Sequence, residues 1–192
     1  MRRGATALVW ARALAAILLL GACDSEEASP HDSATADQAA QDAGGDVSVD
    51  AATPAPGCAA AKLLTLVGGR VKVTGTTAGA TNEFGEAITC GGGAGLTGPQ
   101  VYYRAQLLAA KDYLIRLTPA YSRAALYVFG GACTAASVSS ACGSKGVAGA
   151  VSLGTTNGQI VELLFSPTAS GKYTVAVDGR GATNYGAFEL SV

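Results

Sequence analysis

Histidine is almost absent from this sequence, which contains only His31 among its 192 residues. Residues 58–192 contain none. This absence excludes Ser/His and Cys/His nucleophile pairs from that part of the chain, and it removes the commonest ligand of zinc sites. His31 stands alone in a polar run, so we interpret it as a solvated residue rather than a metal ligand or a catalytic base.

Long apolar runs are also missing. The apolar run 13–20 has only eight residues, whereas a membrane-spanning helix needs about 20. Three arginines precede this run, and it leads into the motif Leu20-Gly21-Ala22-Cys23. Such a pattern is typical of a bacterial lipoprotein signal peptide, and we favour it over a transmembrane anchor. We therefore expect residues 1–22 to be removed and Cys23 to carry a lipid anchor of acyl chains such as palmitate.

Lysine and arginine are absent from residues 24–57, which contain eight Asp or Glu residues and almost no large apolar side chain. Such a segment cannot bury enough apolar surface to offset the conformational entropy lost on ordering. We therefore predict that residues 23–57 are the lipidated cysteine followed by a disordered acidic linker. The linker would hold the domain formed by residues 58–192 away from the membrane.

Basic residues are not clustered in the domain of residues 58–192. Its ten Lys or Arg and six Asp or Glu residues give a formal charge of +4 (10 − 6). Because the basic residues occur singly, this charge does not indicate a nucleic-acid-binding surface. The apolar pattern has a period of two rather than 3.6, as in half-buried antiparallel strands.

Strands are expected in eight segments that are separated by Gly, Asn and Asp turn residues. These segments are 63–67, 70–74, 100–107, 111–118, 124–129, 159–165, 172–178 and 187–192. No segment has a convincing helical pattern. About eight short strands without a helix predict an all-β fold, an antiparallel β-sandwich in which two sheets share one core.

Four cysteines follow Cys23, and no two of them form a C-x-x-C pair. An export signal places them in an oxidising compartment, where an even number indicates disulfides. Four cysteines can form two disulfides in three different ways. We favour Cys133 with Cys142, which share a Gly/Ser-rich segment, and consequently Cys58 with Cys90. The missing C-x-x-C spacing argues against a four-thiolate metal site.

Five motifs follow one another along the domain. They are VTGTTAGATN at 73–82, GPQVYY at 98–103, AALYV at 124–128, GKYTVAVDG at 171–179 and YGAFELSV at 185–192. In this order they resemble the bacterial pre-peptidase C-terminal (PPC) domain, in the form found in lipoproteins of myxobacteria and their relatives. The resemblance covers about residues 71–192. It implies a jelly-roll-like β-sandwich, usually a non-catalytic appendage of secreted proteases, that in some members binds matrix polymers or calcium.

Two differences from the PPC pattern limit what the resemblance implies. Family members often carry an acidic residue where this chain has Gln100 and Arg123, so properties that depend on that charge are not transferred. No peptidase domain accompanies the motifs. The six carboxylates of the domain fit solvated strand and turn positions, so we expect neither an enzyme nor a cofactor.

Oxygen ligands for calcium occur in two groups, Asn82 with Glu83 and Glu86, and Asp178 with Asn184. Neither group has the dense acidic spacing of a calcium-binding loop. Asn82 and Asp178 also fit turn positions. We therefore assign no metal site.

Tyr102, Tyr121 and Tyr185 are the candidate ligand-binding residues, because they are expected to point outward, where their rings could stack on a sugar or a peptide. The sequence thus favours a lipoprotein of the bacterial cell envelope, at the periplasmic face or the cell surface. It would display a non-catalytic binding or adhesion module for a polysaccharide or matrix polymer. The alternative is a structural envelope lipoprotein that acts through protein partners. The sequence does not decide whether the protein is anchored in the inner or in the outer membrane.

Overall fold

The computed structural model describes residues 57–85, 88–90, 94–143 and 149–192. The expected signal peptide, the lipidation at Cys23, the lone His31 and the acidic linker up to residue 56 lie outside the described residues. Within the described ranges, no helix is long and apolar enough to cross a membrane.

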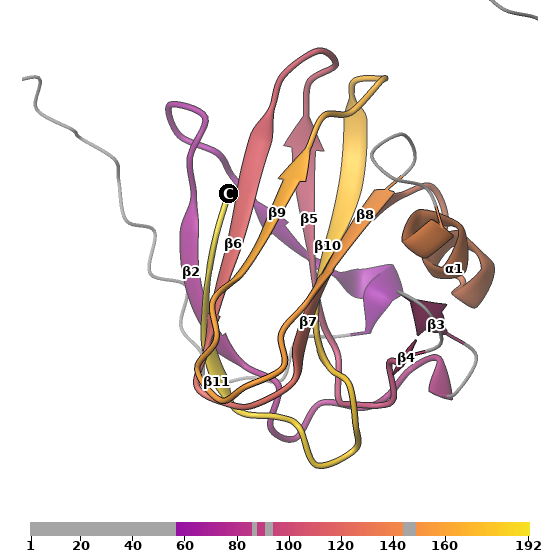
Figure 1. Cartoon of the computed structure of the whole chain (residues 1–192). Coiled ribbons are helices and arrows are strands. Elements are labelled where there is room, and N and C mark those ends of the chain that lie inside the picture. Colours follow the sequence, from indigo (N-terminus) through magenta and orange to yellow (C-terminus); the bar gives the residue numbers. More distant parts are fainter. Residues whose placement is uncertain (1–56, 86–87, 91–93, 144–148) are drawn as a thin grey trace, which may run out of the picture. The chain divides into compact units, whose positions relative to one another are not determined.

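Two sheets face each other to form an antiparallel β-sandwich (Figure 1). The five-stranded sheet has the order β1 (Lys62–Leu64), β5 (Val101–Leu107), β10 (Gly171–Gly179), β7 (Ala124–Gly130) and β8 (Gly149–Leu153). The four-stranded sheet has the order β2 (Lys72–Thr76), β11 (Ala187–Ser191), β6 (Tyr113–Pro119) and β9 (Val161–Phe165). Neighbours are antiparallel except β1 and β5, which are parallel. The expected all-β, jelly-roll-like sandwich is confirmed.

The main hydrophobic core lies between the two sheets. On β6, Ile115 and Leu117 are buried in this core, whereas Leu114 and Arg116 are exposed on the outer face. The residues of β9 alternate in the same way. Each large apolar side chain buried in this manner contributes about 1.5–3 kcal/mol. The period-two pattern therefore fixes which face of the four-stranded sheet is inside.

The core shared by the two inner faces is as expected, but a second hydrophobic core, which the sequence analysis did not predict, covers the outer face of the five-stranded sheet. In β7, Leu126 and Val128 belong to the main core, and Tyr127 and Phe129 belong to the second. The cover includes Cys58 of η1 (Cys58–Ala60), Ile88 just before β3 (Thr89–Cys90), Leu96 just after β4 (Ala94–Gly95), and Val138 and Ala141 of α1 (Ala135–Gly143). Figure 1 shows α1, β3 and β4 on the side of the sandwich away from β2 and β6.

Helix α1 was not expected from the sequence, which predicted no helix. Its first turn is capped by Thr134, whose Oγ1 accepts a hydrogen bond from the backbone N–H of Ser137 at 3.2 Å. A threonine at this position satisfies a backbone donor that the helix itself leaves unpaired. Val138 and Ala141 on the helix are buried in the second core. Tertiary packing of this small apolar face therefore stabilises a segment whose Gly/Ser-rich composition suggested a loop.

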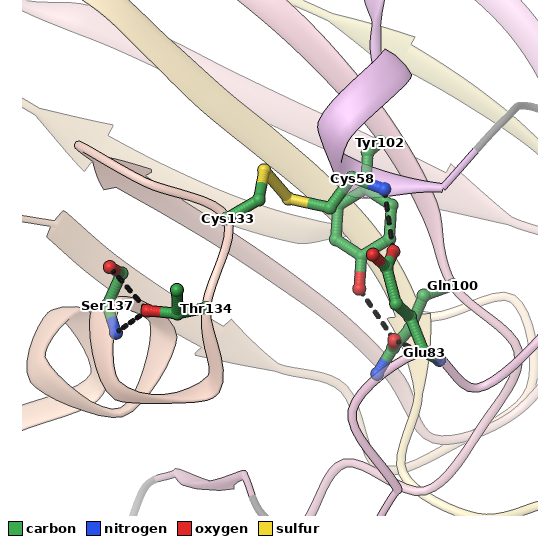
Figure 2. The surroundings of a disulfide bond; sticks show 7 residues. All are labelled: Cys58, Glu83, Gln100, Tyr102, Cys133, Thr134 and Ser137. Atoms are coloured by element: carbon green, nitrogen blue, oxygen red, sulfur yellow. Dashed lines mark hydrogen bonds between the residues drawn. A yellow bond between two sulfur atoms is a disulfide. The ribbon is translucent and has the colours of Figure 1, made fainter.

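The favoured disulfide pairing is wrong, because Cys58 is joined to Cys133 with a Cα–Cα distance of 5.7 Å. This bond ties η1 to the loop before α1 (Figure 2). Helix formation is the physical reason. From Ala135 to Cys142 the helix α1 rises by roughly 10 Å, more than the ~7 Å that a disulfide spans, and Cys133 lies before the first residue of this helix. The pairing of Cys58 with Cys90 is excluded because Cys58 is already bonded.

Candidate functional site

A cluster of buried polar side chains joins β5, β7 and β10. The carboxylate of Asp178 accepts hydrogen bonds from Gln100 Nε2 at 2.9 Å and from the hydroxyl of Tyr127 at 3.2 Å. Its other oxygen accepts from the backbone N–H of Gly179 at 2.6 Å. The hydroxyl of Tyr102 donates to Gln100 Oε1 at 2.6 Å. We call these residues the Asp178 cluster.

Burial determines the charge of the Asp178 cluster. Desolvation raises the pKa of Asp178 to about 8, although the donors Gln100, Gly179 and Tyr127 favour the ionised form. Burial also raises the pKa of Tyr102 and Tyr127 well above the ordinary phenol value. Because Asp178 and Tyr127 are fully buried, the cluster is inaccessible to a substrate. Its role is to hold three strands together at one end of the sheet.

Two of the three candidate ligand-binding tyrosines are buried, so the expectation that they point outward is wrong. Tyr102 does point away from the main core, but the second core covers it. Figure 2 shows its ring beside the disulfide at Cys58. Tyr121 is buried in the main core and donates a hydrogen bond to the backbone oxygen of Asp178 at 3.1 Å. Tyr185 is 49% exposed and stays accessible to a ligand.

The residues considered as calcium ligands serve in local hydrogen bonds. Glu83 Oε2 accepts from the backbone N–H of Cys58 at 2.6 Å (Figure 2), and Asn82 Oδ1 accepts from that of Gly85 at 2.9 Å. Asn184 Nδ2 donates to Ser122 at 3.2 Å. Glu86 lies outside the described residues. In the part of the chain that the structure describes, no three His, Cys, Asp or Glu residues are grouped to hold a metal ion.

An open groove of about 790 Å³ lies at one end of the four-stranded sheet. It is located where β11 ends between β2 and β6, and Figure 1 shows the carboxyl end of the chain at this place. Its lining comes from the segments before β2 and β6 and from the end of β11. The lining residues are Gly69, Arg70, Val71, Lys72, Leu108, Lys111, Asp112, Tyr113, Leu114, Ser191 and Val192.

The side chains of the groove combine positive charge with apolar surface. Three of them are cationic and one, Asp112, is acidic. Lys72 forms an ion pair with Glu189 at 2.8 Å, and Asp112 accepts a hydrogen bond from Ser166. Leu108 and Leu114 are 52% and 54% exposed. This arrangement suits a ligand that has both negative charge and apolar groups.

The groove and Tyr185 are at opposite ends of the four-stranded sheet, because Tyr185 comes just before β11 and the groove lies at the end of that strand. Sequence reasoning did not find the groove. Leu114 stands at an outward position of an alternating strand, where a polar residue is usual. This exposed leucine was the sequence signal that could have indicated the groove.

Neither a scan against protein-family models nor a search of the curated proteins finds a match for this chain.

Proposed function

We propose that this protein is a lipid-anchored lipoprotein of the bacterial envelope whose β-sandwich is a non-catalytic binding or adhesion module. The groove at the end of β11 is its ligand site, and its ligand is a polysaccharide or matrix polymer with negative charge. The groove carries this proposal, because its volume of about 790 Å³ is in the usual range of ligand sites. The motif Leu20-Gly21-Ala22-Cys23 provides the cysteine that carries the lipid anchor.

The contacts of the acidic residues support a non-catalytic role. Glu162 pairs with Arg116 at 3.3 Å and Glu189 pairs with Lys72. Glu83 caps the backbone of η1, and Asp178 is buried within its cluster. Catalysis by carboxylates needs two acidic groups that face each other across a substrate, whereas each of these four is paired with another group of the protein.

A co-sedimentation experiment tests the proposed function. The full-length lipoprotein, purified in detergent, is incubated with insoluble peptidoglycan, chitin or fibrillar collagen, with and without calcium. We expect saturable binding to at least one polymer. Lys111→Glu should weaken this binding about tenfold because it reverses a charge at the groove. Lys62→Glu is the matched control, since Lys62 is an exposed cation of β1 in the other sheet.

Each outcome has a distinct meaning. Binding that is lost in Lys111→Glu and retained in Lys62→Glu supports the proposed site. Binding that survives Lys111→Glu and is lost in Tyr185→Ala would move the ligand site to the opposite end of the sheet. No binding to any polymer by the folded protein would refute the module and favour a structural envelope lipoprotein.

A further inference from the structure

Two arginines lie side by side where β10 leads into the loop before β11. The backbone N–H of Arg180 donates to the backbone oxygen of Arg123 at 2.9 Å. This bond continues the antiparallel pairing of β10 with β7, in which Gly179 lies opposite Ala124. The register therefore places Arg180 opposite Arg123. At such positions the Cβ atoms of two strands are about 4.5–5.5 Å apart.

The charges of this arginine pair are not balanced by an acid of the domain. Within the described ranges, neither guanidinium takes part in an ion pair or a side-chain hydrogen bond. The acidic side chains that the structure describes are all bonded to other groups: Glu83, Asp112, Glu162, Asp178 and Glu189. Like charges at opposite positions of an antiparallel pair are destabilising. The fold alone therefore gains nothing from two arginines here.

Each arginine also has a local feature that lowers stability. The Nε atom of Arg180 is buried and has no hydrogen-bond partner among the described residues, and an unpaired buried donor is destabilising. Arg123 has a φ of +57°, in the left-handed region that long side chains rarely adopt. Backbone strain of this kind is concentrated at functional sites. Three unfavourable features thus coincide at one pair of residues, which indicates a role in binding.

The arginine pair is open to a ligand and suits a carboxylate. Arg123 is exposed, and Arg180 is half-buried. A guanidinium group presents its N–H donors in a planar fork that matches the two oxygens of a carboxylate. A carboxylate bound between the two side chains would also remove the repulsion between their positive charges. The pair therefore selects an anionic ligand.

An exposed aromatic ring belongs to the loop that begins at Arg180. Tyr185 in this loop is 49% exposed. The loop is held against the segment before β7, because Asn184 Nδ2 donates to Ser122 Oγ at 3.2 Å. Figure 1 shows the loop, in yellow, at the bottom of the sandwich. An aromatic ring that is open to solvent provides an apolar surface for the face of a sugar ring.

We propose that Arg123 and Arg180 bind the carboxylate of a uronate, an acidic sugar unit whose ring packs on Tyr185. A uronate is a unit of the same class of ligand as that proposed for the groove, a polysaccharide with negative charge. One sugar of this size should bind with a Kd of about 1 mM. The site is therefore an auxiliary contact for a polymer that the groove binds more strongly. None of its residues lines the groove, so the two sites are tested separately.

Ligand-observed NMR tests the inference. Methyl galacturonide is titrated into the full-length lipoprotein, in a detergent without sugar groups, and saturation-transfer difference spectra are recorded. The protein carries Lys111→Glu, so that the groove contributes little to binding. We expect saturable binding with a Kd of about 1 mM. The methyl ester of the same sugar keeps the ring and loses the charge, and it should bind at least about fivefold more weakly.

Variants in the same background locate the sugar. Arg123→Asn and Arg180→Gln should each weaken binding at least about fivefold, because each removes one guanidinium. Asn tolerates a positive φ, so Arg123→Asn removes the charge without adding backbone strain. Lys172→Gln is the matched control. It removes an exposed cation at the other end of β10, and it should change the Kd less than twofold.

Urea denaturation separates a loss of binding from a loss of folding. No partner of either guanidinium is found in the part of the chain that the structure describes, so both arginine variants should keep the midpoint of their parent. A lower midpoint would make the arginines structural and would overturn the site. Equal binding of the uronate and its methyl ester, or unchanged binding in both variants, overturns it as well. Polymer co-sedimentation and its dependence on Lys111 still decide the proposed function.

Discussion

The side-chain amide of Gln100 is hydrogen-bonded to Asp178 through its nitrogen and to Tyr102 through its oxygen. Its Nε2 donates to Asp178 Oδ2 at 2.9 Å, and its Oε1 accepts from the hydroxyl of Tyr102 at 2.6 Å. The same Oε1 accepts from the backbone N–H of Glu83 at 3.1 Å. A carboxylate at this position lacks the donor that Asp178 requires. The glutamine therefore matches this particular buried acid.

Gln100→Glu should lower the free energy of unfolding by about 2–4 kcal/mol at pH 7, because it removes a hydrogen-bond donor and places a second buried carboxyl beside Asp178. Urea denaturation of the full-length protein measures the change. Gln106→Glu is the matched control, because Gln106 is exposed on the same strand, and we expect it to stay within about 0.5 kcal/mol of the wild type. Equal stability of the two variants would contradict the role assigned to Gln100.

The raised pKa of Asp178 makes stability depend on pH. The unfolded chain ionises this group near its ordinary value of 3.8, and the folded protein ionises it near 8. Between these values the folded state binds more protons, so the free energy of unfolding falls as the pH rises from about 4 to about 8 and levels off above.

Asp178→Asn keeps the side chain neutral at every pH and should remove this slope. Urea denaturation at pH values from 5 to 9 provides the measurement, and the difference between the variant and the wild type isolates the contribution of residue 178. Parallel pH profiles for the two proteins would show that Asp178 does not titrate in this range.

Much of the sandwich was predictable, because burial of one face requires a period of two. Strands β6 and β9 show this alternation and were found within a few residues. The same reasoning failed to predict the second core. The run 124–129 is apolar at every position, which is typical of a strand buried on both faces, and this was the missed signal for a second layer over Tyr127.

The candidate site was less predictable, because it depends on where strands end relative to one another. The groove exists because β11 and β6 pair in one register, with Ser191 opposite Arg116, and the sequence does not specify that register. The same limit applies to Tyr102. Alternation placed its side chain on the outer face correctly, but it could not show that η1, β3, β4 and α1 cover that face.

The disulfide between Cys58 and Cys133 should be a major source of stability. It closes a loop of 75 residues, for which the chain-entropy model gives about 4 kcal/mol. We expect Cys133→Ser to lower the free energy of unfolding by a value of this order. Mass spectrometry of the unreduced, digested protein should detect a peptide that links Cys58 to Cys133. Linkage of Cys58 to Cys90 instead would contradict the structure.

Cys90 and Cys142 are the cysteines left for a second disulfide once Cys58 and Cys133 are joined. Cys90 ends β3, Cys142 lies in the last turn of α1, and these two elements are in contact. Because an oxidising compartment favours pairing of the remaining thiols, we expect a Cys90–Cys142 bond. Alkylation of the unfolded, unreduced protein should then leave both residues unlabelled. Labelling at both would disprove the second bond.

At Gly179, β10 lies close to the backbone of the loop before β11. A Cβ atom there would overlap the backbone oxygen of Asn184, and backbone cannot move aside as a flexible side chain does. We expect Gly179→Ala to lower the free energy of unfolding by about 3 kcal/mol, the upper range for overpacking. Gly171→Ala is the matched control at the other end of β10, where a Cβ would have no neighbour within 4 Å, and it should change stability by less than about 0.5 kcal/mol. Equal effects of the two substitutions in urea denaturation would mean that the end of β10 and this loop are not in contact in solution.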